Sequence, residues 1–131
     1  MPTRPLSPHL GIYKMSRYTL ATSIFNRFTG VALSAGLVLL VYWLLAVAGG
    51  PRSFASAARV LSLTVMKIVY AGFIVAFCFH MVAGIRHLVW DTGRGLERRQ
   101  SQRSAWLVAA VSVLLMLAVG YCAWFAGTRA P

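Results

Sequence analysis

Three long runs without a charged side chain constrain what this sequence can fold into. They cover residues 31–50, 68–85 and 105–127, and are 20, 18 and 23 residues long. A helix rises about 1.5 Å per residue, so about 20 apolar residues cross the roughly 30 Å hydrocarbon core of a bilayer. The runs therefore predict an all-α integral membrane protein with three transmembrane helices. We expect spans at about 23–49, 63–91 and 104–127, within a single membrane-anchor domain over residues 1–131.

The positive charge of the chain is placed around these runs. The formal net charge is +11, from 13 Lys and Arg residues and two acidic residues. Three spans put the N-terminal segment and the second loop on the same side, which holds nine of the basic residues: Arg4, Lys14, Arg17, Arg27, Arg86, Arg94, Arg98, Arg99 and Arg103. The positive-inside rule makes that side cytoplasmic. Contact with anionic membrane lipid accounts for most of the charge, so no nucleic-acid partner is expected.

The segments outside the runs also carry predictions. Three prolines predict an irregular segment over residues 1–20 on the cytoplasmic face, with Thr22 or Ser23 capping the first helix. The loop through about Ser62 alternates small and basic residues and is expected in the membrane interface. Cys78 and Cys122 fall inside spans and are expected to be reduced and buried. The short N-terminus without a transit peptide favours a bacterial inner membrane.

A polar stripe marks the end of the second span. On a helix, His80, Gly84, His87 and Asp91 lie within about 60° of one another. His80 stands 11 residues before Asp91, which places it about 16 Å from the cytoplasmic end. An ionisable group at that depth normally faces a cofactor, an ion path or another helix. An imidazole above a glycine gap suits axial ligation of haem iron, with His87 and Arg86 able to reach the propionates.

Spacing alone leaves other interpretations open. A histidine inside a membrane can simply hydrogen-bond a neighbouring helix, and glycine can serve tight packing. Arg86, His87 and Asp91 can be anchors at the membrane interface. A second cluster, formed by Ser23 and Arg27 with Gly30 on the same helix face, can bind a carbonyl or an anion, or it can be a helix cap and a lipid-facing arginine.

Three segments together resemble the cytochrome b membrane-anchor subunit of succinate dehydrogenase. The first runs from Arg4 through His9 to Lys14, the second is Ser23–Gly30, and the third is His80 with Gly84–Leu88 and Asp91. Their order and their relation to the three spans match, so the resemblance covers essentially the whole chain.

The resemblance implies a role for each segment. His80 matches the axial ligand of a b-type haem whose second ligand comes from a companion anchor subunit. Ser23 and Arg27 match residues that line a ubiquinone pocket. The implied partners are this second anchor, an iron–sulfur subunit and a flavoprotein subunit, all attached to the membrane. The chain is then a non-catalytic subunit of an enzyme, because it has no dinucleotide fingerprint and no cysteine cluster.

The sequence departs from the family pattern at one position. Asn26 stands where the pattern usually has histidine, and asparagine cannot carry a proton or a positive charge. We hypothesise that a neighbouring cation such as Arg27, or a partner residue, takes over that histidine's role.

Two alternative functions stay open on sequence alone. One is an anchor of a quinol:fumarate reductase, which runs the reaction in reverse. The other is a haem-free membrane assembly or packing subunit whose histidines only join helices.

Overall fold

The structure, a computed structural model, describes residues 17–129, and all secondary structure in that range is helical. The helices are α1 (Arg17–Ala48), α2 (Pro51–Leu61), α3 (Thr64–Asp91) and α4 (Arg98–Arg129). Three segments, Thr19–Ala48, Thr64–Asp91 and Arg98–Ala123, are long and apolar enough to cross a membrane. The prediction of an all-α protein with three membrane-spanning helices is therefore confirmed.

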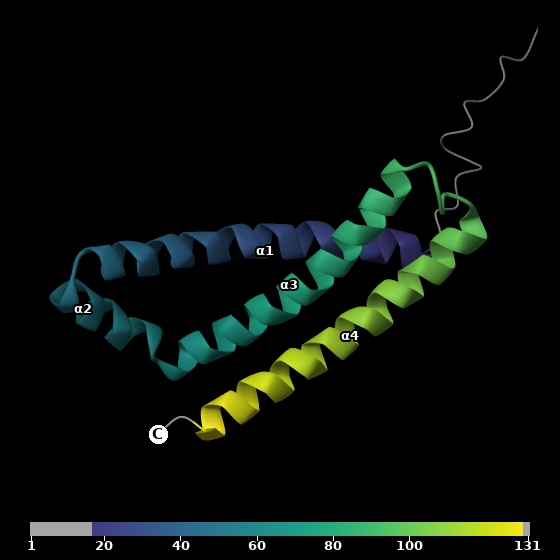
Figure 1. Cartoon of the computed structure of the whole chain (residues 1–131). Helices are drawn as coiled ribbons and strands as arrows, with labels where there is room; N and C mark the ends of the chain where they lie inside the picture. Colours follow the sequence, from purple (N-terminus) through teal and green to yellow (C-terminus); the bar gives the residue numbers. More distant parts are fainter. Residues whose placement is uncertain (1–16, 130–131) are drawn as a thin grey trace, which may run out of the picture.

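The three long helices meet at one end of the molecule. Helix α3 packs against both α1 and α4, and α3 and α4 lie side by side in opposite directions (Figure 1). Helix α1 crosses α3 near the loop that joins α3 to α4, and the two helices diverge towards α2. The start of α1, the end of α3 and the start of α4 are therefore neighbours. The short α2 bridges α1 and α3 at the opposite end.

Small side chains allow the close packing of α3 and α4. The buried cluster consists of Val82, Ala83 and Val108, with Phe79, Val111 and Leu115 packed against it. Ala76 and Ala105 are buried as well. Within a membrane, apolar side chains gain little by leaving lipid, so helices associate through close van der Waals contact between small residues.

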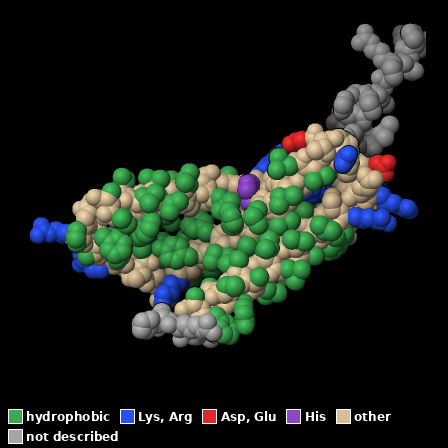
Figure 2. Space-filling view, viewed as in Figure 1, with side chains coloured by type: hydrophobic (Ala, Val, Ile, Leu, Met, Phe, Trp, Pro, Cys, Tyr) green, Lys and Arg blue, Asp and Glu red, His purple; other side chains and the backbone are tan. Residues whose placement is uncertain are grey.

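Most of the apolar surface faces outward. Phe28, Val31 and Val38 in α1 are each about 70% exposed. Hydrophobic side chains cover the middle of the molecule, while Lys and Arg lie towards its ends (Figure 2). Such a surface requires lipid or apolar protein partners around it.

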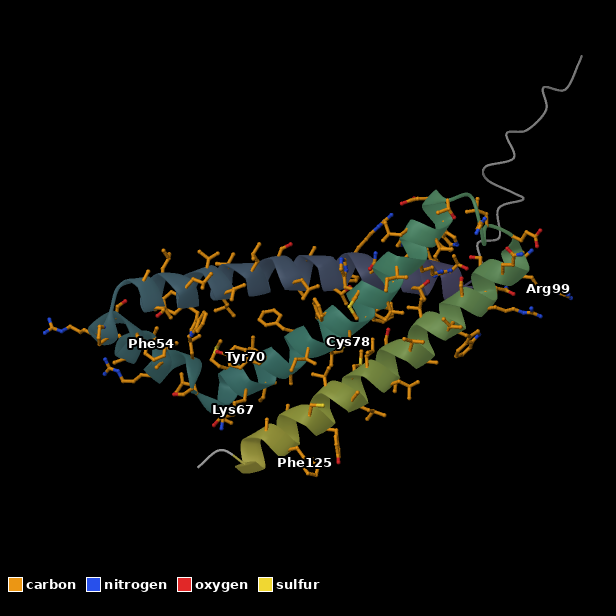
Figure 3. All side chains as sticks on the ribbon, viewed as in Figure 1. Phe54, Lys67, Tyr70, Cys78, Arg99 and Phe125 are labelled. Carbon is orange, nitrogen blue, oxygen red and sulfur yellow. The ribbon has the colours of Figure 1, made fainter. Side chains whose placement is uncertain are left out.

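The ends of α2 are held by specific local features. Gly50 has a φ of 85°, a conformation that favours glycine, and Pro51 begins the helix at a position where its missing N–H is not needed. At the other end, the Tyr70 hydroxyl of α3 donates a hydrogen bond to the Leu61 carbonyl at 3.1 Å. Figure 3 shows Tyr70 on the part of α3 nearest to α2.

Several sequence-based boundaries were wrong. Thr22 and Ser23 do not cap the first helix, because helix is already present from Arg17, and residues 17–20 are not irregular. The last helix begins at Arg98 instead of Ser104, and the predicted loop before Ser62 contains α2. An apolar run marks the part of a helix that lies in hydrocarbon, and charged turns extend the helix beyond it.

Two further expectations have different outcomes. Cys78 is buried as expected, but Cys122 is exposed on α4. The family-like segment at residues 4–14, including His9, lies outside the described residues.

Candidate functional site

The side chain of His80 is fixed against α1 by one of its two ring nitrogens. Its Nδ1 lies 3.1 Å from the backbone carbonyl oxygen of Asn26 and 3.2 Å from the hydroxyl oxygen of Thr29. A carbonyl oxygen can only accept, so we assign the ring proton to Nδ1, which donates to Asn26. The Thr29 hydroxyl lies within 3.0 Å of the carbonyl oxygens of Phe25 and Asn26, to which it can donate. Its lone pairs therefore remain available to Nδ1.

This hydrogen bond determines what the other nitrogen can do. With the proton on Nδ1, the Nε2 of His80 carries a lone pair and is the possible metal ligand. Metal-binding histidines usually donate their second ring N–H to a carbonyl or a carboxylate, which fixes the tautomer and the ring orientation. The half-buried His80 has this arrangement, with Nδ1 facing the Asn26 carbonyl.

Two glycines, Gly30 of α1 and Gly84 of α3, describe the space around the His80 side chain. A Cβ atom built on Gly30 would lie 3.2 Å from Cε1 of His80, so a larger residue there would require the imidazole to shift by a few tenths of an ångström. A Cβ atom on Gly84 would meet nothing within 4 Å. The space over Gly84, one turn from His80 on α3, is therefore open within the part of the chain that the structure describes. The lone pair on Nε2 and the open space over Gly84 are both features that a flat, iron-containing macrocycle would need.

No protein-built metal cluster accompanies His80 within residues 17–129. Among the described residues, no three His, Cys, Asp or Glu side chains gather in one place.

The other members of the predicted stripe lie towards the end of α3. His87 is half-buried, and its ring meets the Trp90 ring edge-on, with the centroids 5.2 Å apart. Asp91 is exposed. The structure therefore leaves His87 partly open to a ligand, while Trp90 fixes one side of its ring.

Arg86 has a different environment from the one that its sequence position suggested. It is 8% exposed, and its guanidinium donates hydrogen bonds to Thr22 of α1 and to Ser101 and Ser104 of α4. The sequence reasoning missed these partners. The spacing of Ser101 and Ser104, which share one face near the start of α4, was the available signal, but only the packing shows which side chain they face.

Ser23 and Arg27 lie at the outer surface of α1. Ser23 is half-buried, and Arg27 is exposed. Arg27 lines a surface hollow of about 300 Å³ together with Ile24, Phe28 and Val31. Its other lining residues are apolar, so the hollow can take an apolar molecule beside Arg27.

Asn26 contributes its backbone to the site and leaves its side chain unpaired. The backbone carbonyl oxygen of Asn26 accepts a hydrogen bond from Nδ1–H of His80. Its side-chain Oδ1 is buried without a hydrogen-bond partner among the described residues. Such groups are normally paired in native proteins. This unpaired amide oxygen, one turn before Gly30, can accept a hydrogen bond from a further donor.

The amino-acid sequence is similar to those of one family of membrane proteins. The family model for "Succinate dehydrogenase/Fumarate reductase transmembrane subunit" matches residues 1–119. The chain is 43% identical to the succinate dehydrogenase cytochrome b556 subunit of Paracoccus denitrificans over 112 residues, which cover 86% of this chain and 85% of that protein. It is 39% identical to the cytochrome b556 subunit of Rickettsia typhi over 114 residues, covering 87% and 88%. It is 41% identical to the mitochondrial cytochrome b560 subunit of Homo sapiens over 113 residues, covering 85% and 66%.

Proposed function

The chain belongs to the family of succinate dehydrogenase/fumarate reductase transmembrane subunits, and we propose that it supplies half of a b-type haem site and part of a ubiquinone site. As a succinate dehydrogenase cytochrome b subunit it is a membrane anchor. The succinate-oxidising chemistry belongs to other subunits of the complex, because this chain has only two acidic residues and two cysteines.

His80 is the proposed haem ligand, and its bond to Asn26 is the observation that carries the proposal. The carbonyl of Asn26 keeps the proton on Nδ1 and so keeps Nε2 free to bind iron. A bound haem supplies a centre that accepts and releases one electron at a time. A companion anchor subunit would supply the other iron ligand, and His87, with its ring partly exposed, would hydrogen-bond a propionate.

Ser23 and Arg27 are the proposed quinone ligands. A hydroxyl can donate to a quinone oxygen, and a guanidinium stabilises the negative charge that grows on that oxygen during reduction. The exposed position of Arg27 in an apolar hollow supports a pocket that is completed by other subunits. Electrons from succinate then reach quinone at this end of the helices.

The distribution of charge supports a proposal for the membrane arrangement. We propose a bacterial inner membrane, with the N-terminus and the α3–α4 loop on the cytoplasmic side, because basic residues are concentrated there. The flavoprotein and iron–sulfur subunits then attach on that side. Residues 1–131 act as one anchor domain.

Haem content tests the central part of this proposal. The complex is purified with its partner subunits, and haem is identified by its pyridine haemochrome spectrum and counted against protein. We expect one b-type haem per copy of this chain. An assembled, active complex without haem would show that His80 only joins α3 to α1.

A further inference from the structure

Arg86 is the only charged side chain that is buried among the described residues. The two acidic residues of the chain, Asp91 and Glu97, are both exposed, and neither is among its hydrogen-bond partners. A cation inside a membrane protein without a carboxylate partner is costly, and such residues usually serve a function.

The guanidinium joins three helices through separate nitrogen atoms. Nη1 donates to the Thr22 hydroxyl of α1 at 2.9 Å, and Nε donates to the Ser104 hydroxyl of α4 at 2.9 Å. Nη2 donates to the carbonyl and hydroxyl oxygens of Ser101 at 2.9 and 3.2 Å. The Trp90 ring covers the guanidinium, with its centroid 4.1 Å from Cζ. Each of the three nitrogen atoms therefore donates at least one hydrogen bond within the chain.

Large apolar side chains near the start of α1 are mostly exposed. The large apolar side chains around Thr22, namely Leu20, Ile24 and Phe25, are 43%, 41% and 60% exposed. Phe25 contacts the Phe79 ring of α3 edge-on, with the centroids 6.1 Å apart, and the bond from Arg86 is a direct polar link at this end of α1. The next link, from His80 to Asn26, lies one turn further along α1.

We propose that Arg86 is a positioning residue for the quinone site rather than a ligand of a haem propionate. Thr22 is adjacent to Ser23 and just over one turn from Arg27, so the bond from Arg86 to Thr22 fixes the turn of α1 that carries both. The inference rests on the proposed roles of Ser23 and Arg27. It also explains why arginine is needed, since the planar fork of arginine donates in three directions and a lysine ammonium cannot reproduce that geometry.

The test uses three variants of the assembled complex in membranes. Arg86→Lys keeps the charge and removes the fork, and Thr22→Val removes only the hydroxyl on α1. Arg94→Gln, in the exposed α3–α4 loop, is the control for loss of an arginine. The KM for a short-chain ubiquinone is measured beside the rate of succinate oxidation with a soluble acceptor that bypasses the membrane. Amide hydrogen exchange over residues 19–27 is measured on the same preparations.

We expect Arg86→Lys and Thr22→Val to raise the quinone KM about five- to tenfold, since small misplacements of binding groups have large effects. The rate with the soluble acceptor stays unchanged, exchange over residues 19–27 becomes faster, and Arg94→Gln behaves as the wild type. The double variant resembles Arg86→Lys, because both changes break the same bond.

Two results would overturn the inference. In one, the quinone KM of Arg86→Lys stays at the wild-type value, whether or not exchange becomes faster. In the other, both variants lower only the amount of assembled complex. Failure of the proposed quinone site itself is separate, because Ser23→Ala would then leave the quinone KM unchanged.

Discussion

The Nδ1 atom of His80 lies 3.1 Å from the backbone carbonyl oxygen of Asn26, across the contact between α3 and α1. This bond links the proposed haem ligand directly to the helix segment that carries Ser23 and Arg27. A movement of α1 along its axis would therefore turn the imidazole as well as shift the quinone ligands. The two proposed sites share one structural support.

Gly30→Ala tests how tightly the imidazole is held. The new Cβ atom would lie 3.2 Å from Cε1 of His80, so the ring must shift by a few tenths of an ångström. Overpacking of this kind typically costs about 1–3 kcal/mol. We expect a shifted haem absorption band and a severalfold loss of bound haem during purification. Gly72→Ala, whose Cβ atom meets nothing within 4 Å on the same chain, is the control and should retain haem. Equal haem retention in both variants would contradict the crowding argument.

Gly84→Leu tests whether the open space beside His80 holds a cofactor. Within the described chain a Cβ atom at Gly84 meets nothing within 4 Å, so a larger side chain can begin there without a close contact to α1 or α4. We therefore expect this chain to accumulate in the membrane at the wild-type level while the complex loses most of its haem. The measurements are immunodetection of the chain and the haem-to-protein ratio. Full haem content in Gly84→Leu would mean that the macrocycle lies elsewhere.

Asn26→His restores a titratable group beside the proposed haem. The backbone carbonyl that holds His80 is retained, and the side chain replaces an unpaired buried amide oxygen. A protonated imidazole favours the reduced haem, because reduction adds negative charge. The haem potential should therefore rise as the pH falls through about 6–7, whereas the wild type lacks that component. Redox titration at several pH values measures this, with Asn26→Gln as a neutral control. Identical pH profiles in all three proteins would remove the motivation for assigning Asn26 a role.

Tyr70→Phe tests the contact that holds α2. The Tyr70 hydroxyl donates to the Leu61 carbonyl at 3.1 Å, far along α3 from His80. Loss of the hydrogen bond should lower the free energy of unfolding by about 1 kcal/mol and leave quinone reduction unchanged. Thermal unfolding in detergent measures the first quantity and steady-state turnover the second. The exposed Tyr42→Phe should match the wild type in both. A large loss of turnover in Tyr70→Phe would show that α2 affects the distant site.

The three spans could be predicted because the length of an uncharged run is a direct physical requirement of the bilayer. Helix α2 could also have been recognised, since Phe54, Ala57 and Leu61 repeat at helical spacing after Pro51. Its basic and small residues instead suggested a loop. Helix ends were missed because charged turns continue beyond the hydrocarbon core.

The candidate site was only partly predictable. The depth of His80 in the span indicated a functional group, because an ionisable side chain there requires a partner. That partner is a backbone carbonyl, at Asn26, and every residue has one, so no sequence pattern could mark it. The partners of Arg86 likewise come from other helices. Thr22 of α1 lies 64 positions from Arg86 along the chain, and Ser104 of α4 lies 18 positions from it. Their proximity depends on how the helices cross.

The most direct test is the reduced-minus-oxidised absorption spectrum of membranes carrying the complex with His80→Gly, recorded with and without added imidazole. The account predicts that the b-type α-band is lost or shifted in the variant and recovers with imidazole, which can occupy the place of the missing side chain. His87→Gly, measured in parallel, should keep the band. A wild-type band in His80→Gly without imidazole, at full haem content, would show that His80 does not bind the iron.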